Sequence, residues 1–112
     1  MNQSGRDAED RALNWLLRQG LVMVERNWRC KGGELDLVML DADCWVFVEV
    51  RYRADSRFGG AAQSLTPTKL GRLRHAASVY MQGKGLFDAP CRFDAVLSQG
   101  DGRLDWIRNF LA

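Results

Sequence analysis

The sequence predicts an α/β domain in which a mixed sheet is flanked by two helices. Apolar residues recur at helical spacing in two segments, whereas five other segments have the alternating or continuous apolar pattern of strands. The order is helix, three strands, helix, strand, plus a C-terminal strand, and the link through the second helix is long enough for a parallel crossover. Because the chain has 112 residues and no linker or internal repeat, a single domain over residues 1–112 is expected.

The first helix is expected to begin behind a cap at Ser4 or Asp7 and to stop at Gly20, a residue that suits a helix end. Its apolar residues have the spacing of one buried helix face: Ala8, Ala12, Leu13, Trp15, Leu16 and Leu17. A short apolar run with β-branched valine follows, which predicts a first strand over residues 21–24.

The next two segments form the centre of the predicted sheet. Glycines at 32–33 signal a turn, and residues 34–40 begin by alternating polar and apolar side chains, as a strand with one buried face does. Residues 44–52 are rich in valine and aromatic residues and predict the following strand. A hairpin turning on residues 42–43 would join these two strands in antiparallel fashion.

The second half of the chain begins with a helix. Thr66 is a suitable N-cap, Pro67 fits the first helical position, and the apolar stripe ends near Gly83. Two more strands are expected, over residues 92–98 and from 104 to about 110, with a glycine-containing turn between them.

The composition is that of an ordinary globular protein and excludes several other classes. Hydrophobic residues make up 46% and charged residues 27% of the chain, which is unlike an intrinsically disordered sequence. No apolar run of 18 residues is present and the N-terminus lacks the apolar stretch of a signal peptide, so we expect a cytoplasmic protein without a membrane partner. Three cysteines with no C-x-x-C pair disfavour a disulfide framework and a structural zinc site.

The charge is unevenly distributed along the chain. Residues 1–50 hold 6 basic and 9 acidic residues, whereas residues 51–112 hold 10 basic and 5 acidic residues, giving net charges of −3 and +5. Of the 16 basic residues 13 are arginine, whose planar guanidinium suits phosphate groups. The asymmetry therefore hints at a polyanionic partner, although a charged run is also typical of an ordinary solvated face.

Polar residues inside two neighbouring strands form the candidate chemical site. Glu34 and Asp36 share one face of their strand, and Glu49 shares one face of the next strand with Arg51. If the hairpin turns on residues 42–43, two residues face each other across the strands when their numbers add up to 85. Asp36 is then opposite Glu49, at a β-carbon separation of about 4.5–5.5 Å. By the same register Glu34 is opposite Arg51.

Two facing carboxylates repel each other, so a neutralising group is expected between them. A divalent cation would fit, because Mg²⁺ takes one or two carboxylates together with water and phosphate oxygens, and it activates a phosphodiester toward hydrolysis. The alternative that the spacing leaves open is that Glu49 forms an ion pair with Arg51, Arg53 or another arginine.

The residues around these acids resemble a known family. The two motifs that carry most of the resemblance are G-E-L-D-L-V at residues 33–38 and V-F-V-E-V-R-Y-R at residues 46–53. The chain resembles the YraN-type family of uncharacterised bacterial proteins, which is itself similar to Holliday-junction resolvases and the wider PD-(D/E)xK nuclease superfamily. Further matching strings extend the resemblance to nearly the whole chain: residues 5–9, 26–29, 57–62, 66–69 and 91–94.

The resemblance implies a restriction-endonuclease-like fold and a metal-dependent endonuclease site. Asp36 and Glu49 would be ligands for Mg²⁺ or Mn²⁺, and Arg51 would occupy the usual position of the catalytic lysine. Glu9 matches an acidic residue that resolvase relatives use at the metal site, and Glu34 matches an auxiliary or structural position. Because arginine stays protonated and cannot act as a base, Arg51 would supply electrostatic stabilisation only.

The implied partner is nucleic acid, with DNA favoured and branched DNA as one candidate substrate. The residues expected to contact it are basic: Arg53, Arg57, Lys69, Arg72 and Arg74. A non-catalytic nucleic-acid-binding module of the same fold is the alternative that arginine at position 51 favours. A scaffold for an acidic protein partner is a third interpretation. A homodimer is compatible with the resemblance, because resolvase-like proteins are symmetric two-site cutters.

Three further residues are interpreted separately from this site. His75, the single histidine, is expected on the surface or half-buried, and Asp94 is expected to form an ion pair with an arginine. Trp28, flanked by charged and polar residues, is expected to be the exposed aromatic residue of the chain.

Overall fold

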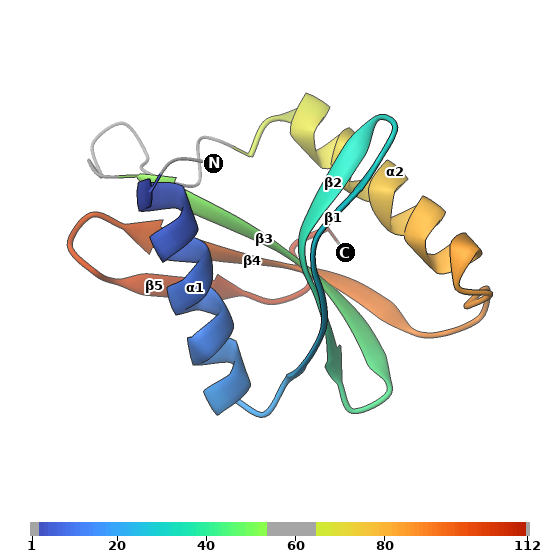
Figure 1. Ribbon diagram of the computed structural model, residues 1–112, viewed down its shortest axis with the longest axis horizontal. Coiled ribbons are helices and arrows are strands. Elements are labelled where there is room, and N and C mark those ends of the chain that lie inside the picture. The colour runs from blue at the N-terminus through green and yellow to red at the C-terminus, as the bar shows by residue number, and fades with distance from the viewer. Residues whose placement is uncertain (1–2, 54–64, 112) are drawn as a thin grey trace.

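The computed structural model describes residues 3–53 and 65–111, with side chains from Gly5 onward. This part of the chain forms two helices and five strands in the predicted order (Figure 1). Their bounds are α1, Gln3–Arg18; β1, Val22–Cys30; β2, Gly33–Asp41; β3, Cys44–Arg53; α2, Pro67–Gly83; β4, Cys91–Gln99; and β5, Leu104–Ile107. Neither of these helices is long and apolar enough to cross a membrane. Arg57, one of the residues expected to contact nucleic acid, lies outside the described residues.

All five strands form one mixed sheet with the spatial order β1-β2-β3-β4-β5. The pairs β1–β2, β2–β3 and β4–β5 are antiparallel, whereas β3 and β4 are parallel and are linked through α2. α1 packs on one face of the sheet and α2 on the other (Figure 1). This arrangement confirms the predicted α/β fold with its parallel crossover and its additional C-terminal strand.

Each helix encloses its own hydrophobic core against the sheet. Leu16 of α1 packs in one core with Val46 and Val48 of β3, and Tyr80 of α2 packs in the other core with Phe47. Successive residues of a strand point to opposite faces, so β3 contributes to both cores. The C-terminal end of β3 therefore emerges between the two helices, where the residues of the candidate site lie.

The bounds of the C-terminal elements follow local signals, with one difference. Thr66 caps α2 as predicted, and its hydroxyl accepts a hydrogen bond from the Lys69 amide at 3.3 Å. β5 ends at Ile107 instead of near residue 110, because the chain turns back and the Phe110 amide donates to the Phe93 carbonyl at 2.9 Å.

β1 is longer than predicted, reaching Cys30, and it is kinked at Asn27. Asn27 has a φ of 54°, in the left-handed region that asparagine tolerates better than most residues. In a regular strand Arg26 and Trp28 would point to the same face, but Arg26 reaches α1 whereas Trp28 packs on Tyr80 of α2. The expectation of an exposed Trp28 is therefore wrong, since its ring packs edge-on with the centroids 5.2 Å apart.

The paired strand β2 changes faces at the same point. Leu37 belongs to the core under α1 and Leu35 to the core under α2, although they are two residues apart. Their partners on β1 are Arg26 and Trp28, the residues on either side of the kink. Asp36 lies between the two leucines and belongs to neither core. The kink thus frees Asp36 from the hydrophobic interior.

The tip of the β1–β2 hairpin lies directly on α2. A Cβ atom added at Gly33 would come within 2.5 Å of the Arg72 carbonyl oxygen, so only glycine fits there without a shift of backbone. Beside it, the His75 Nε2 atom hydrogen-bonds with the Lys31 carbonyl oxygen at 3.0 Å. His75 is exposed, as expected, and helps to fasten the hairpin to the helix.

Asp94 is fully buried in β4 and organises the C-terminal end of the chain. It forms the expected ion pair with an arginine, because Arg92 Nε lies 3.0 Å from its Oδ1 atom. It also accepts hydrogen bonds from the Trp106 indole at 3.0 Å and from the Asn109 amide at 2.9 Å. Asp94 therefore has a structural role, and it does not line the cleft of the candidate site.

Candidate functional site

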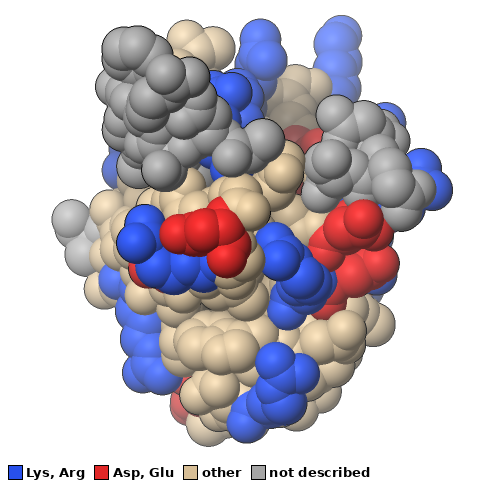
Figure 2. Space-filling view, turned by 90° about the vertical axis from the view of Figure 1, so that its left-hand side faces the viewer, with Lys and Arg blue, Asp and Glu red and all other residues tan. Residues whose placement is uncertain are grey.

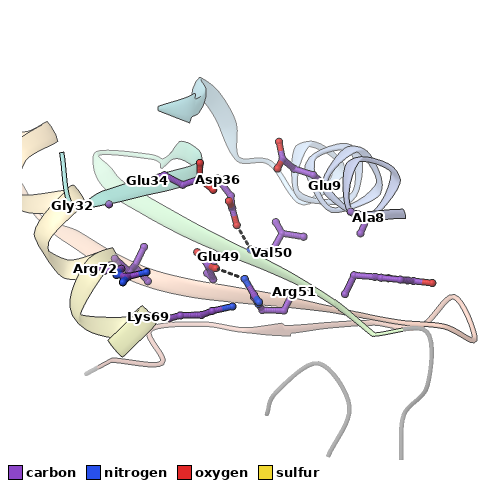
Figure 3. Close-up of a pocket in the computed structure, with 14 residues that line it drawn as sticks. Ala8, Glu9, Gly32, Glu34, Asp36, Glu49, Val50, Arg51, Lys69 and Arg72 are labelled. Carbon is purple, nitrogen blue, oxygen red and sulfur yellow. Dashed lines mark hydrogen bonds and ion pairs between the residues drawn. The ribbon is translucent and has the colours of Figure 1, made fainter. Parts of the chain in front are cut away.

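A cleft of about 690 Å³ opens between α1, the tip of the β1–β2 hairpin, the end of β3 and the start of α2 (Figure 3). Among the residues that line it are seven that the sequence singled out: Glu9, Glu34, Asp36, Glu49, Arg51, Lys69 and Arg72. They come from four elements, α1, β2, β3 and α2, which span most of the chain. The fold therefore gathers most of the predicted site into one cavity.

The β2–β3 register brings Asp36 and Glu49 together. The strands pair with residue numbers that sum to 85, from the hairpin turn as far as Leu37 and Val48. Just beyond the last pair, Asp36 Oδ2 accepts a hydrogen bond from the Val50 amide at 2.9 Å (Figure 3). This bond holds the Asp36 carboxyl against β3, close enough to Glu49 for the Glu49 carboxylate to raise the pKa of Asp36.

Glu34 does not face Arg51, contrary to the pairing expected from the sequence. Beyond the kink β2 stays paired with β1, and Glu34 forms an ion pair there with Arg29, with Nε and Oε2 2.8 Å apart. Arg51 instead forms an ion pair with Glu49, with Nη1 and Oε1 3.1 Å apart. The Glu49–Arg51 pair that the sequence left open as an alternative is therefore present.

Burial makes the two central carboxyl groups weak acids. Asp36 is 6% exposed, and the loss of solvent together with the nearby Glu49 carboxylate raises its pKa to about 8, although the Val50 amide opposes this shift. Burial also raises the pKa of Glu49, against the opposing effect of Arg51. A cation placed against both carboxyl groups would favour their ionised forms.

Glu9 adds a third carboxyl group on the α1 side of the cleft. It is 1% exposed, and its Oε1 atom accepts a hydrogen bond from Arg26 Nε at 2.7 Å. Arg26 also bonds Asp10, so its guanidinium is fixed between two acids of α1. The Glu9 Oε2 atom is buried and has no hydrogen-bond partner among the described residues. A buried carboxylate oxygen of this kind can accept a bond from a ligand at little cost to the protein.

The carboxyl groups suit a hard divalent cation. Within residues 3–53 and 65–111, no group of three or more histidine, cysteine, aspartate or glutamate side chains is arranged as a metal site. The donors on offer are therefore the Asp36–Glu49 pair, with the unpartnered Glu9 oxygen bordering the same cleft. Mg²⁺ and Mn²⁺ favour oxygen donors, and Mg²⁺ completes its shell with water and phosphate oxygens, so two carboxylates are enough.

The basic residues expected to contact nucleic acid are divided by the fold. Lys69 and Arg72 lie in the first half of α2 and line the cleft opposite α1 (Figure 3). Lys69 is close enough to Glu49 to lower the pKa of that carboxyl group. Arg53 is exposed at the end of β3 and is not among the residues that line the cleft. Arg74 lines a separate groove on the other side of α2.

Sequence reasoning gave no role to Arg26, Arg29 or Tyr52. Tyr52 lines the cleft, and the two arginines hold the acids Glu9 and Glu34. The Arg29–Glu34 contact could have been predicted from the glycine turn, because a hairpin turning on residues 31–32 places Arg29 opposite Glu34. Nothing in the sequence indicated that Arg26 would reach a helix 17 residues earlier.

The fold and the site define an α/β protein in which two neighbouring carboxyl groups, one buried and one half-buried, share a cleft with basic side chains. The chain belongs to the Uncharacterised protein family UPF0102, whose model matches residues 8–97. This membership confirms the resemblance to the YraN-type family.

Relatives in several bacteria are similar over almost their whole length. A UPF0102 protein of Pseudomonas entomophila is 54% identical over 111 residues, which cover 95% of this chain and 90% of the relative. A UPF0102 protein of Neisseria gonorrhoeae is 44% identical over 108 residues, covering 96% of this chain and 94% of the relative. The similarity therefore includes both helices and the strands that carry the site.

Proposed function

We propose that the protein binds nucleic acid, preferably DNA, in this cleft and hydrolyses a phosphodiester bond with Mg²⁺ or Mn²⁺ held by Asp36 and Glu49. The observation that supports this most strongly is the convergence of the buried Asp36 carboxyl group and the half-buried Glu49 carboxyl group at a cleft that Lys69 and Arg72 also line. Protein interiors rarely retain neighbouring carboxyl groups without a compensating charge, and a bound cation provides one. The resolvase-like sequence pattern points to the same chemistry.

Each residue of the cleft would have a definite task. Asp36 and Glu49 would hold the ion, and the Val50 amide would orient the Asp36 carboxyl group. Such an ion supplies Lewis-acid activation of the phosphodiester and a more acidic bound water. Arg51, oriented by its ion pair with Glu49, would stabilise the negative charge that develops on the phosphate. Because arginine cannot accept a proton, the proton of the attacking water would leave to solvent.

The walls of the cleft would position the nucleic acid. Lys69 and Arg72 are three residues apart on α2 and share one face of the helix, from which they can contact successive phosphates of one strand. Glu9, on the opposite wall, would accept a hydrogen bond from water at the metal site. The resemblance also leaves a homodimer as an expectation, which light scattering on the purified protein would test.

A second candidate function is nucleic-acid binding without cleavage. The observation that favours it is the Glu49–Arg51 ion pair, because a guanidinium 3.1 Å from Glu49 already neutralises one of the two carboxyl groups. In that case Arg51 replaces the metal ion, and the cleft binds phosphates through arginine and lysine alone. Such binding would weaken steeply with salt, as expected for the release of counterions.

Cleavage of a DNA panel separates these two functions. Linear, flapped and four-way substrates are incubated with Mg²⁺, Mn²⁺ or EDTA, using the wild type and the double variant Asp36→Asn plus Glu49→Gln. We expect metal-dependent cleavage by the wild type and none by the double variant, while Asp88→Asn, which removes an exposed charge outside the cleft, behaves as the wild type. Cleavage that persists in the double variant refutes the site. Salt-sensitive binding without cleavage under either metal establishes the second function.

A further inference from the structure

Tyr52 separates the cleft from a second cavity. This cavity, which we call the side groove, has a volume of about 620 Å³ and lies between the N-terminal half of α1 and the β4–β5 turn. Its walls include Asp10 and Arg11 of α1, Gln99, and Asp101 of the turn. Tyr52 lines both cavities and is half-buried. Its side chain forms no hydrogen bond or ring contact with the other described residues, so an aromatic surface stands without a partner between two cavities.

Gln99, which lines the side groove, carries an unsatisfied hydrogen-bond acceptor. It is 6% exposed, and its Oε1 atom is buried without a hydrogen-bond partner among the described residues. The backbone around it is well fixed, because the Gln99 amide donates to the Arg103 carbonyl at 3.0 Å and its carbonyl accepts from the Gly102 amide at 3.0 Å. A buried acceptor of this kind destabilises the protein unless a donor reaches it.

The charges of the side groove disfavour a phosphate group. Asp7, Asp10 and Asp101 contribute three carboxylates to its wall. Asp10 is already paired with Arg26, which does not line the groove, and the cationic member, Arg11, is already bonded to the Ser98 hydroxyl. Figure 2 looks onto the end of the molecule that carries the β4–β5 turn and shows acidic and basic side chains interspersed there. A ligand that suits such a groove is neutral, flat enough to stack on a tyrosine, and has amino groups that donate hydrogen bonds. A nucleobase has all three properties.

We propose that the side groove binds an unpaired nucleobase of a nucleic acid whose backbone lies in the cleft. This inference rests on the nucleic-acid binding proposed above and specifies its substrate class as strands with an unstacked nucleotide, such as a flap or a branch point. The base stacks on Tyr52, and an exocyclic amino group of adenine, cytosine or guanine donates to Gln99 or to the carboxylates of the wall.

The test measures binding, in EDTA, of the full chain to a fluorescein-labelled DNA duplex with a single-stranded flap. Each nucleotide near the branch is replaced in turn by an abasic site, and affinity is measured by fluorescence anisotropy. We expect one position at which loss of the base weakens wild-type binding by roughly 5- to 150-fold, the range of one base–aromatic stack. Tyr52→Ala should weaken binding to the intact DNA by a similar factor, with no further loss at the abasic position.

Matched variants exclude a general structural effect. Tyr52→Phe keeps the stacking surface and should bind within about twofold of the wild type, because stacking needs only the ring. Phe87→Ala removes an aromatic ring that is 75% exposed and borders neither cavity, and it should leave affinity unchanged. The proposal is overturned if Tyr52→Ala weakens binding to every abasic DNA by the same factor as binding to the intact DNA. It is also overturned if Tyr52→Ala causes no loss of affinity.

Gln99 is tested from the side of the DNA, which avoids a change in the protein interior. At the responsive position, adenine is replaced by purine, which lacks the exocyclic amino group and keeps the ring. Weaker binding of the purine DNA supports the hydrogen bond, whereas equal affinity overturns it. Because every measurement is made without metal, absence of cleavage would refute only the proposed nuclease function. If the protein binds the DNA but no abasic replacement weakens binding, only the proposed base site is refuted.

Discussion

Replacing Asp36 by asparagine should stabilise the protein at alkaline pH. Asparagine retains an oxygen that can accept the Val50 amide bond, but it cannot carry the charge that burial disfavours. The pKa of Asp36 rises from 3.8 to about 8 on folding, so between these values the folded state holds a proton that the unfolded state has lost. The contribution of the protonated Asp36 to the free energy of unfolding is therefore fully present below pH 4 and is lost progressively as the pH rises to about 8.

The size of the effect follows from the shift. Four pKa units at about 1.4 kcal/mol each set an upper limit of about 6 kcal/mol, and water entering the cleft reduces it. We expect Asp36→Asn to raise the free energy of unfolding by about 2 kcal/mol or more near pH 9, and by much less near pH 5. Urea denaturation in EDTA at both pH values measures the difference.

Two controls accompany this measurement. Asp88→Asn, at an exposed position outside the cleft, should show no pH-dependent gain. Adding Mg²⁺ near pH 9 should stabilise the wild type but not Asp36→Asn, because the cation takes over the role of the proton. If Asp36→Asn is destabilising, or changes stability equally at both pH values, the buried-acid interpretation of the cleft is refuted.

Three further predictions concern the residues that shape the cleft. Arg26→Gln should cost about 2 kcal/mol in urea denaturation by leaving the Glu9 carboxylate buried and unpaired, and Glu9→Gln should recover most of that loss. Asn27→Gly should be tolerated, whereas Asn27→Val should cost about 1–3 kcal/mol because its φ is 54°. Gly33→Ala should cost more than about 1 kcal/mol because its Cβ meets backbone of α2, whereas Gly71→Ala, with open space, should stabilise the helix by about 0.5–1 kcal/mol. Equal thermal midpoints for the two alanine variants would contradict the close contact at the hairpin tip.

The sequence predicted the parts of the fold that are set by local signals. Thr66 and Pro67 mark the start of α2 through capping and a fixed φ, which depend on a few neighbouring residues. The turn at residues 42–43 sets the β2–β3 register, and this register alone brings Asp36 to Glu49. The central pair of the site was therefore accessible from the sequence.

The features that the sequence missed depend on contacts between distant elements. The left-handed Asn27 has no signature beyond its residue type, yet it sends Arg26 and Trp28 to opposite faces. The separation of Arg74 from Arg72 was predictable from helix geometry. Residues two positions apart project to different sides of a helix, and Arg74 does so on α2.

A crystal soaked in Mn²⁺ tests the central claim most directly. We expect an anomalous peak coordinated by the carboxyl oxygens of Asp36 and Glu49, with Glu9 bordering the bound water. A guanidinium of Arg51 bridging the two carboxyl groups, with no anomalous peak in the cleft, would contradict the metal site.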